Sequence, residues 1–199
     1  MFPKTVLIGA AVVGAVLVVG SQLRTASEEQ MARAASDTAG SATSSQAAVA
    51  DLQDLDGNTL GTVTFTETPS RIVHVVVSAT DVPEGVHGFH IHETGACDAS
   101  TGFTSADGHL AGDRKHGLVE GGPHPGDLPN VHVHADGKLD VEYFIAGPED
   151  ERDGWIESVG LFDTNGSAVV LHAGADDYES QPSGAAGDRI ACGVIVERE

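Results

Sequence analysis

The sequence predicts an all-β fold: an antiparallel β-sandwich or barrel that carries two long loops. Three observations support this class. Short apolar runs alternate with a period of two, turn signals separate them, and glycine is abundant (25 of 199 residues) while aromatic residues make up only 5%. A period of two places every second side chain on the same face of a strand. Several such strands at close spacing are typical of a sandwich or barrel.

The expected strands are rich in Val, Ile, Thr and Phe, and turn signals such as DGN, PEG, ADGK and TNGS lie between them. They occupy the runs 57–68, 71–80, 87–93, 130–144, 155–163 and 167–174. Two segments lack the pattern and are expected to be loops, 93–129 and 174–188. Loops as long as the first are uncommon in a compact domain unless they have a function.

The N-terminal segment differs from the strand-rich region. Lys4 precedes an uncharged apolar run from Val6 to Gly20, which suits a signal-peptide core better than a bilayer span of about 20 residues. If the run extends to Leu23, it could instead serve as a membrane anchor and tether the protein. We therefore expect an exported protein, periplasmic, cell-surface or extracellular. Its parts would be a signal peptide or anchor over 1–23, an Ala-, Ser- and Thr-rich linker over 24–48, and a folded domain over 49–199.

The two cysteines, Cys97 and Cys192, allow either one disulfide or two free buried thiols. An oxidising compartment outside the cytosol favours the disulfide. Export and disulfide are thus linked expectations.

The charge is strongly acidic, with 30 Asp and Glu against 10 Lys and Arg. The first 49 residues hold three of each sign, so the formal net charge of −20 lies in residues 50–199. Such a surface repels phosphates, and we expect no nucleic-acid partner. It suits a high-salt environment, where salt screens the self-repulsion.

Two histidines lie in the run HGFHIHE. Because residues i and i+2 of a strand point to the same face, His90 and His92 present their imidazoles together, and Phe89 and Ile91 face the core. An isolated pair of this kind is also found as two solvent-facing histidines. The neighbouring loop favours another interpretation, in which the two imidazoles bind one metal ion.

That loop supplies three more histidines and an aspartate, and a further histidine, His172, ends the run AVVLH. Imidazoles with one carboxylate suit zinc, and imidazoles also suit copper. A metal would supply the ordering free energy that so long a loop lacks. The loop residues are His109, His116, His124 and Asp127.

Five motifs occur in the order known from one enzyme family: GFHIHETGAC, KHG, HPGDLPNV, VVLHAGADDY and GDRIACGV. Over about residues 50–199 the sequence resembles copper/zinc superoxide dismutase, in particular its exported bacterial branch. The resemblance implies an immunoglobulin-like Greek-key antiparallel β-sandwich or barrel with two long functional loops. It also implies copper and zinc as cofactors and superoxide as the substrate. It is also compatible with a homodimer.

The resemblance implies a role for each matching residue. Copper would be held by His90, His92, His109 and His172, and zinc by His109, His116, His124 and Asp127, with His109 bridging the two as an imidazolate. Asp176 would connect a copper ligand to a zinc ligand. Arg189 would attract superoxide, His109 would carry a catalytic proton, and Cys97 would pair with Cys192.

Two other functions stay open at this point. A non-catalytic copper/zinc-binding or copper-delivery protein of the same fold would lack some ligands or the arginine. An adhesion or structural sandwich would not need the histidine set. Outside the motifs, we expect His132 and His134 on an exposed strand face, with adventitious metal binding as the alternative. We expect a structural hydrogen-bonding role for His87 and a packing role for Trp155.

Overall fold

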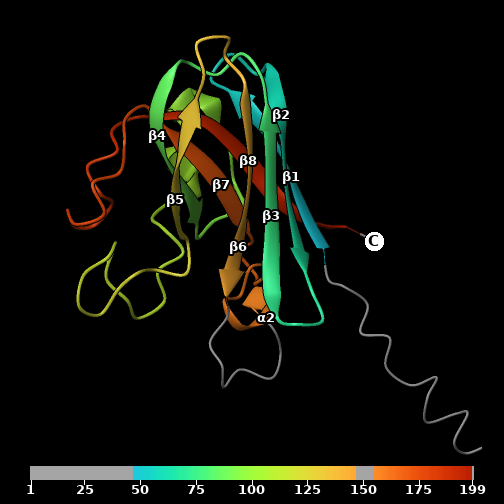
Figure 1. Ribbon diagram of the computed structural model, residues 1–199, viewed down its shortest axis with the longest axis vertical. Coiled ribbons are helices and arrows are strands. Elements are labelled where there is room, and N and C mark those ends of the chain that lie inside the picture. Colours follow the sequence, from blue (N-terminus) through green and yellow to red (C-terminus); the bar gives the residue numbers. More distant parts are fainter. Residues whose placement is uncertain (1–46, 147–154, 199) are drawn as a thin grey trace, which may run out of the picture. The chain divides into compact units, whose positions relative to one another are not determined.

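Eight antiparallel strands form one sheet in the computed structural model, which describes residues 47–146 and 155–198 (Figure 1). The order across the sheet is β5-β4-β7-β8-β1-β2-β3-β6. The strands are β1 (Ala47–Asp54), β2 (Thr59–Glu67), β3 (Ile72–Ala79), β4 (Gly85–His92), β5 (Asp127–Val133), β6 (Leu139–Ala146), β7 (Ser167–His172) and β8 (Arg189–Arg198).

The sheet curls into a nearly closed barrel. Its two end strands, β5 and β6, are joined by a tight turn in which the backbone N–H of Gly137 donates to the carbonyl of His134 at 2.9 Å. In Figure 1, β3 and β6 lie in front and β7 and β8 cross behind them. Connections such as β3 to β4 and β6 to β7 pass between strands that are not neighbours, as in a Greek key. The predicted antiparallel sandwich or barrel is confirmed.

The main core lies between these two layers. Along β3, Val73, Val75 and Val77 are buried, and Phe65 and Phe89 reach the same cluster from β2 and β4. The period-two alternation of the sequence thus places one face of each strand in this core.

A second, smaller core covers the outer face of β7. Val170 and Ala168 of β7 pack there against Phe103 and Ala106, which come from the loop after β4. Because Val169 and Leu171 enter the main core, all six residues of β7 are buried. The loop after β4 is therefore part of the packed structure.

The run 155–163 is not a strand, and that prediction was wrong. Trp155–Ser158 form the short helix α2, followed by turns. The backbone N–H groups of Trp155 and Ile156 donate to the two carboxylate oxygens of Glu67 at 3.0 and 3.2 Å, which satisfies the first donors of the helix. Trp155 is buried in the main core, as its predicted packing role requires.

The predicted strand set also lacked β1. This strand is poor in the β-branched and aromatic residues that mark the other strands, yet Ala48, Ala50 and Leu52 alternate into the core. It begins at Ala47, two residues before the predicted start of the domain. Residues 1–46, with the predicted signal peptide or anchor, lie outside the described residues. Among the described residues, no helix is long and apolar enough to cross a membrane.

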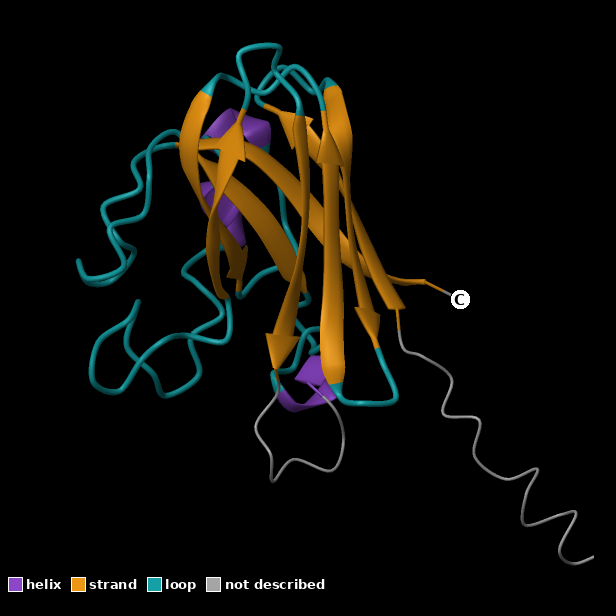
Figure 2. Ribbon diagram, in the orientation of Figure 1, coloured by secondary structure: helices purple, strands orange, loops and turns teal. Residues whose placement is uncertain are grey.

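Two long loops lie between strands, shown in teal in Figure 2. The first follows β4 and contains two 3₁₀ turns, η1 (Ala99–Thr101) and η2 (Thr104–Ala106), and it ends three residues earlier than predicted because β5 begins at Asp127. The second lies between β7 and β8. The loops meet where the backbone N–H of Leu118 donates to the carbonyl of Tyr178 at 2.8 Å.

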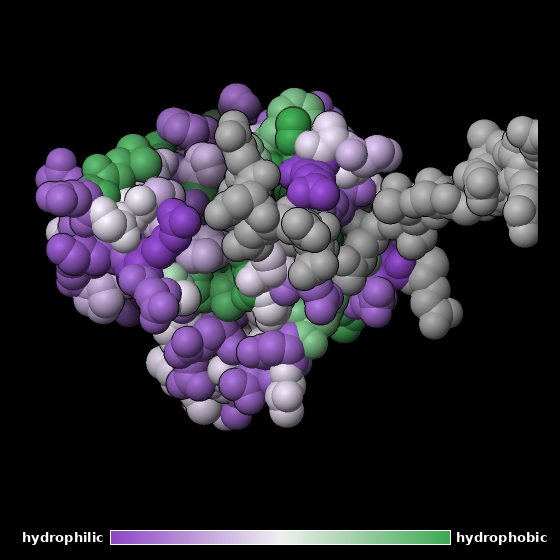
Figure 3. Space-filling view, turned by 90° about the horizontal axis from the view of Figure 1, so that it is seen from below, coloured by the Kyte–Doolittle hydropathy of each residue, from purple (hydrophilic) through white to green (hydrophobic). Residues whose placement is uncertain are grey.

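The surface is largely hydrophilic on the face in Figure 3, where apolar patches are small and scattered. This agrees with the acidic composition, which keeps the surface solvated.

Candidate metal centre

Neighbouring strands and the first loop bring four histidines together. His90 and His92 lie on β4, which pairs with β7, and His172 is the last residue of β7. The loop returns to the end of β4, where His109 forms an isolated β-bridge with His92. Each ligand atom that these four side chains offer lies within 4.8 Å of the others, and all four residues are buried.

One nitrogen of each of these rings has no hydrogen-bond partner within the described part of the chain. The atoms are His90 Nδ1, His92 Nε2, His109 Nε2 and His172 Nε2, and all four are buried. A buried polar atom without a partner is costly, and native structures rarely hold several side by side. Four convergent ring nitrogens are the donor set that copper accepts, so this group fits a copper ion.

The opposite nitrogens of the three strand histidines are held by acceptors. His90 Nε2 bonds to Asp176 Oδ2 at 2.7 Å, His92 Nδ1 to the carbonyl of Asp107 at 2.8 Å, and His172 Nδ1 to the carbonyl of Gly187 at 3.2 Å. A carbonyl only accepts, so Nδ1 of His92 and of His172 must carry the proton. Their partnerless nitrogens therefore hold lone pairs, as metal coordination requires.

Burial keeps these rings neutral. It lowers the pKa of His92 to about 2 and that of His172 to about 3, and it lowers the pKa of His90 as well. Repulsion from neighbouring histidines adds to the lowering, while the hydrogen bonds oppose it. At neutral pH the lone pairs are available without displacing a proton.

A second group surrounds Asp127. Its Oδ1 lies 2.9 Å from Nδ1 of His109, 3.0 Å from Nδ1 of His116 and 3.1 Å from Nδ1 of His124. Its Oδ2 accepts the backbone N–H groups of Gly117 at 2.8 Å and His124 at 3.0 Å. Three imidazole nitrogens and one carboxylate oxygen form a donor set that zinc binds tetrahedrally.

The contacts of His116 are incompatible with a simple neutral ring. Nε2 lies 3.0 Å from Asp176 Oδ1, and Nδ1 lies 3.0 Å from Asp127 Oδ1. A neutral ring has only one N–H, so one of its nitrogens must direct a lone pair at a carboxylate oxygen. A second ring proton or a metal ion between Nδ1 and Asp127 removes this repulsion, and the three nitrogens and one carboxylate oxygen gathered here suit a metal ion.

The carboxylate of Asp127 is held ionised. Burial raises its pKa, but hydrogen bonds from His109 and from the backbone N–H groups of Gly117 and His124 outweigh that effect and hold its pKa well below the usual range. The site therefore keeps a full negative charge for a cation.

His109 belongs to both groups. Its Nδ1 faces Asp127, and its buried Nε2 faces the strand histidines, with its ring centroid 4.1 Å from that of His90 and 4.9 Å from that of His92. One ring thus lies between the two candidate metal positions. This is the bridging position expected from the sequence.

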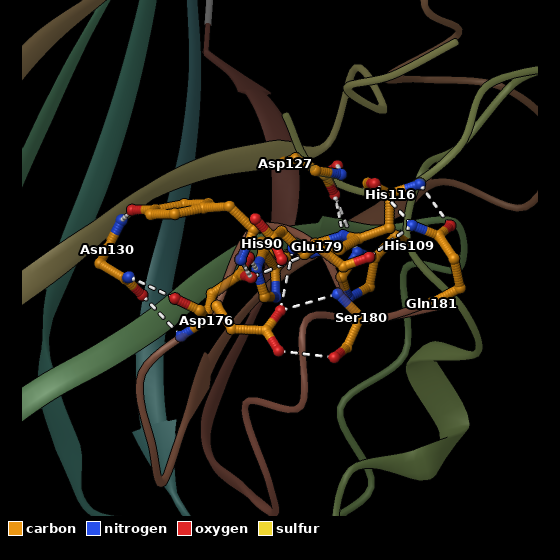
Figure 4. A network of polar contacts seen from close by, with 12 residues as sticks. His90, His109, His116, Asp127, Asn130, Asp176, Glu179, Ser180 and Gln181 are labelled. Atoms are coloured by element: carbon orange, nitrogen blue, oxygen red, sulfur yellow. Dashed lines mark hydrogen bonds and ion pairs between the residues drawn. The ribbon is translucent and has the colours of Figure 1, made fainter. Parts of the chain in front are cut away.

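Asp176 also connects the two groups. Its two oxygens contact His90 and His116, as the dashed lines in Figure 4 show. Burial raises its pKa, but hydrogen bonds from His90, the Tyr178 backbone and His116 together lower it. The expected link between the two ligand groups is present.

Three residues that support this network were not identified from the sequence (Figure 4). Asn130 accepts the backbone N–H of Asp176 at 2.9 Å and donates to its carbonyl at 2.8 Å. The backbone N–H of Asn130 in turn donates to the hydroxyl of Tyr178 at 2.7 Å. Gln181 accepts the backbone N–H of His116 at 3.0 Å and donates to its carbonyl at 2.8 Å. These contacts join segments far apart in the chain, so no local sequence signal identifies them.

Arg189 lies at the edge of the first group and is half-buried. It donates to the carbonyls of Phe103 at 2.7 Å and Asp107 at 2.6 Å, and it pairs with His172 across β7 and β8. His92 donates to the same Asp107 carbonyl, so the guanidinium is held beside the histidine group. Burial lowers the pKa of Arg189, and the charge of Asp107 opposes that shift.

Cys97 and Cys192 form a disulfide, with their Cα atoms 5.6 Å apart. The predicted bond is confirmed. It fastens the start of the first loop to β8, beside the smaller core.

The other histidines match their expected structural roles. His87 is buried, and its two ring nitrogens lie 2.8 Å from the carbonyl oxygen of His172 and 2.9 Å from that of Pro83. His132 and His134 are exposed, whereas Val131 and Val133 face the core. Neither exposed histidine belongs to a ligand group found among the described residues.

Known proteins are similar to this chain in both sequence and fold. The sequence profile of the copper/zinc superoxide dismutase (SODC) family matches residues 59–195. Superoxide dismutase (Cu-Zn) 1 of Aquifex aeolicus is 37% identical over 151 residues, which cover 73% of this chain and 85% of that protein. The Cu-Zn superoxide dismutase of Escherichia coli is 36% identical over 149 residues, which cover 70% of this chain and 80% of that protein.

Solved structures of similar proteins have the same fold. The crystal structure of a SOD-like protein from Bacillus subtilis has a TM-score of 0.66 and 34% sequence identity, covering 74% of this chain and 97% of that one. The two histidine groups match the copper and zinc sites of the family, with His109 shared. Fold, sequence and site together show that this chain belongs to the copper/zinc superoxide dismutase family.

Proposed function

We propose that this protein is a superoxide dismutase that uses copper and zinc. Two superoxide ions and two protons give one oxygen molecule and one hydrogen peroxide. The observation that carries the proposal is the convergence of four buried ring nitrogens that lack any partner, beside a second group that shares His109. Such an arrangement is costly in the metal-free protein, and two bound cations would remove the cost.

The chain's own residues would divide the work between the two metals. When bound, copper would supply the one-electron redox chemistry, and zinc, which has no redox chemistry, would fix the loop. The proposed copper ligands are His90, His92, His109 and His172, and the proposed zinc ligands are His109, His116, His124 and Asp127.

His109 would carry a proton as well as bind metal. With Nδ1 held beside Asp127, the ring would keep its position while Nε2 takes up a proton and donates it to the product peroxide. The partnerless, buried Nε2 among the strand histidines supports this role.

Arg189 would bind the substrate anion. Two carbonyls hold its guanidinium beside His92 and His172, so the orientation of its remaining N–H groups is fixed. A positive charge at this position offsets the repulsion that a surface with a formal net charge of −20 exerts on superoxide.

We also propose that the protein acts outside the cytosol. The disulfide supports this location, since such bonds persist in oxidising compartments. A relative from Drosophila melanogaster, 38% identical over 147 residues, is an extracellular superoxide dismutase. Cell fractionation should recover the protein outside the cytoplasmic fraction, and recovery from the cytosol with both thiols free would contradict the proposal.

The enzymatic function is tested with the full chain loaded with one copper and one zinc. Superoxide decay followed by stopped-flow absorbance should accelerate in proportion to protein concentration. His90→Ala should abolish the activity, and the exposed His132→Ala should not change it. A chain that binds both metals tightly without turnover would instead be a non-catalytic metal-binding or copper-delivery protein.

A further inference from the structure

Asp107 occupies a backbone position that links the first loop to both His92 and Arg189. It follows η2, and its carbonyl accepts His92 Nδ1 at 2.8 Å and Arg189 Nη2 at 2.6 Å. Its own backbone N–H donates to the carbonyl of Thr104 at 3.1 Å. One carbonyl therefore sets the position of a candidate copper ligand and of the arginine together.

The backbone of Asp107 is in a conformation that suits glycine. Its φ is 57° and its ψ is −148°, a combination that the Cβ of an L-residue disfavours. Such residues persist where the surroundings fix the backbone, and they cluster at functional sites. Here the three hydrogen bonds of the Asp107 backbone hold it in place.

The side chain adds a negative charge next to the arginine. Asp107 is exposed, and one of its carboxylate oxygens accepts the hydroxyl of Thr94 at 3.1 Å. Its charge acts on Arg189: burial lowers the pKa of the guanidinium, and the carboxylate of Asp107 opposes that shift. An anion drawn toward Arg189 thus also meets the repulsion of a carboxylate that belongs to the residue whose carbonyl holds the guanidinium.

We propose that Asp107 is the positioning residue of the anion site: its carbonyl fixes Arg189 and His92, and its carboxylate weakens anion binding at low salt. The inference rests on the proposed function for its meaning, since the anion in question is superoxide. The Debye length shortens from about 10 Å at 0.1 M salt to about 3 Å at 1 M, so high salt screens the repulsion from this exposed carboxylate. The carbonyl contacts that position Arg189 and His92 remain.

The alternative is that Asp107 is an ordinary surface acid whose side chain only bonds to Thr94. Asp107→Asn separates the two, because the amide retains an oxygen for Thr94 and loses the charge. The matched control is Asp51→Asn, which removes the same charge from an exposed position on β1.

Azide is the probe, because this small monovalent anion binds Cu(II) and produces a charge-transfer absorption. In the copper- and zinc-loaded full chain, Asp107→Asn should bind azide about two- to fivefold more tightly at low salt, the effect of one full charge within a Debye length. The difference from wild type should vanish at high salt. Asp51→Asn should bind azide as wild type does. Equal azide affinities of the two variants at low salt would overturn the electrostatic part of the proposal.

Asp107→Gly tests the backbone part. Glycine adopts the observed φ and ψ without the steric cost, so the melting temperature of the metal-free protein should rise by about 2–4 °C. Its azide affinity should match that of Asp107→Asn, since both lack the charge. A lower melting temperature for Asp107→Gly than for wild type would show that the backbone conformation of Asp107 is not strained.

The two hypotheses fail in different ways. If the loaded wild-type protein does not consume superoxide, the proposed function fails, while azide affinity and melting temperature still decide the role of Asp107. If wild type consumes superoxide and Asp107→Asn changes neither azide affinity nor the salt dependence of the rate, only the inference on Asp107 fails.

Discussion

His90 and His116 belong to different ligand groups, yet each bonds to one oxygen of the same buried carboxylate. His90 Nε2 lies 2.7 Å from Asp176 Oδ2, and His116 Nε2 lies 3.0 Å from Asp176 Oδ1. The orientation of a ring in one group is thereby tied to that of a ring in the other. We expect disturbance of either site to reach the other through Asp176.

Asp176→Asn should lower the affinity for both metals by about 10- to 100-fold, the usual effect of losing a partner that orients metal ligands. An amide has only one acceptor oxygen, so one of the two histidines loses its acceptor. Competition titration of the metal-free protein against a chelator measures both affinities. Asp113→Asn, which changes an exposed carboxylate of the first loop, serves as the control. Unchanged affinity in Asp176→Asn would contradict the link.

Gly184→Ala should disturb the same carboxylate by steric contact. A Cβ at this position would collide with Asp176 and lie 2.6 Å from His116 Nε2. We expect zinc affinity to fall by about tenfold or more, as for other losses of ligand orientation. The readout is the same chelator competition.

Gly187→Ala is the matched control for that variant. Both glycines have positive φ, +67° and +80°, so both alanines bear a similar backbone cost. A Cβ at Gly187 would meet no atom closer than 3.9 Å. Equal loss of zinc affinity in the two variants would show that backbone strain, and not the contact with Asp176, is responsible.

The metal-free protein should lose stability as the pH falls from 7.5 to 5.5. Burial lowers the pKa of His92 to about 2 and that of His172 to about 3, whereas an unfolded histidine has a pKa of about 6.5. Below 6.5 the unfolded chain binds protons that the folded chain does not, so the stability present above that pH is lost. Each histidine contributes up to about 1.4 kcal/mol per pH unit.

Urea unfolding at the two pH values measures this dependence, and we expect the free energy of unfolding to fall by about 2–3 kcal/mol. His172→Ala should reduce the slope with pH, and the exposed His132→Ala should leave it unchanged. A free energy of unfolding that does not change between the two pH values would contradict the burial of neutral histidines.

Loss of the disulfide should destabilise the domain and loosen the first loop. The bond joins residues 95 positions apart, for which the chain-entropy relation gives about 4–5 kcal/mol. The double variant Cys97→Ser with Cys192→Ser should show this loss in urea unfolding, together with weaker zinc binding. The control is the reduced wild-type protein, which should resemble the variant. Equal stability with and without the bond would show that the loop is held by its packing against β7 alone.

Much of the site could be predicted, partly from a local rule of strand geometry and partly from the family resemblance. The i, i+2 spacing on β4 places His90 and His92 on one face, and the five ordered motifs supply the remaining ligands. The disulfide followed from two cysteines, export and the family resemblance. These features depend on the residue types and their spacing, which the sequence contains.

The remainder depends on contacts between distant segments. The run 155–163 has strand-like alternation, but Glu67 caps its first turn as a helix from almost 90 residues away. The supporting roles of Asn130 and Gln181 likewise arise where the second loop meets β5 and the first loop, respectively. Asp107 contacts His92 and Arg189 through its backbone carbonyl, which every residue type has, so no sequence pattern marks these contacts.

Stopped-flow measurement of superoxide decay in the full chain, loaded with one copper and one zinc, tests the central claim most directly. The account predicts catalytic decay that falls sharply in Arg189→Ala and is unchanged in Arg198→Ala, which removes a cation from the opposite end of β8. Decay no faster than in buffer, at full loading of both metals, would contradict it.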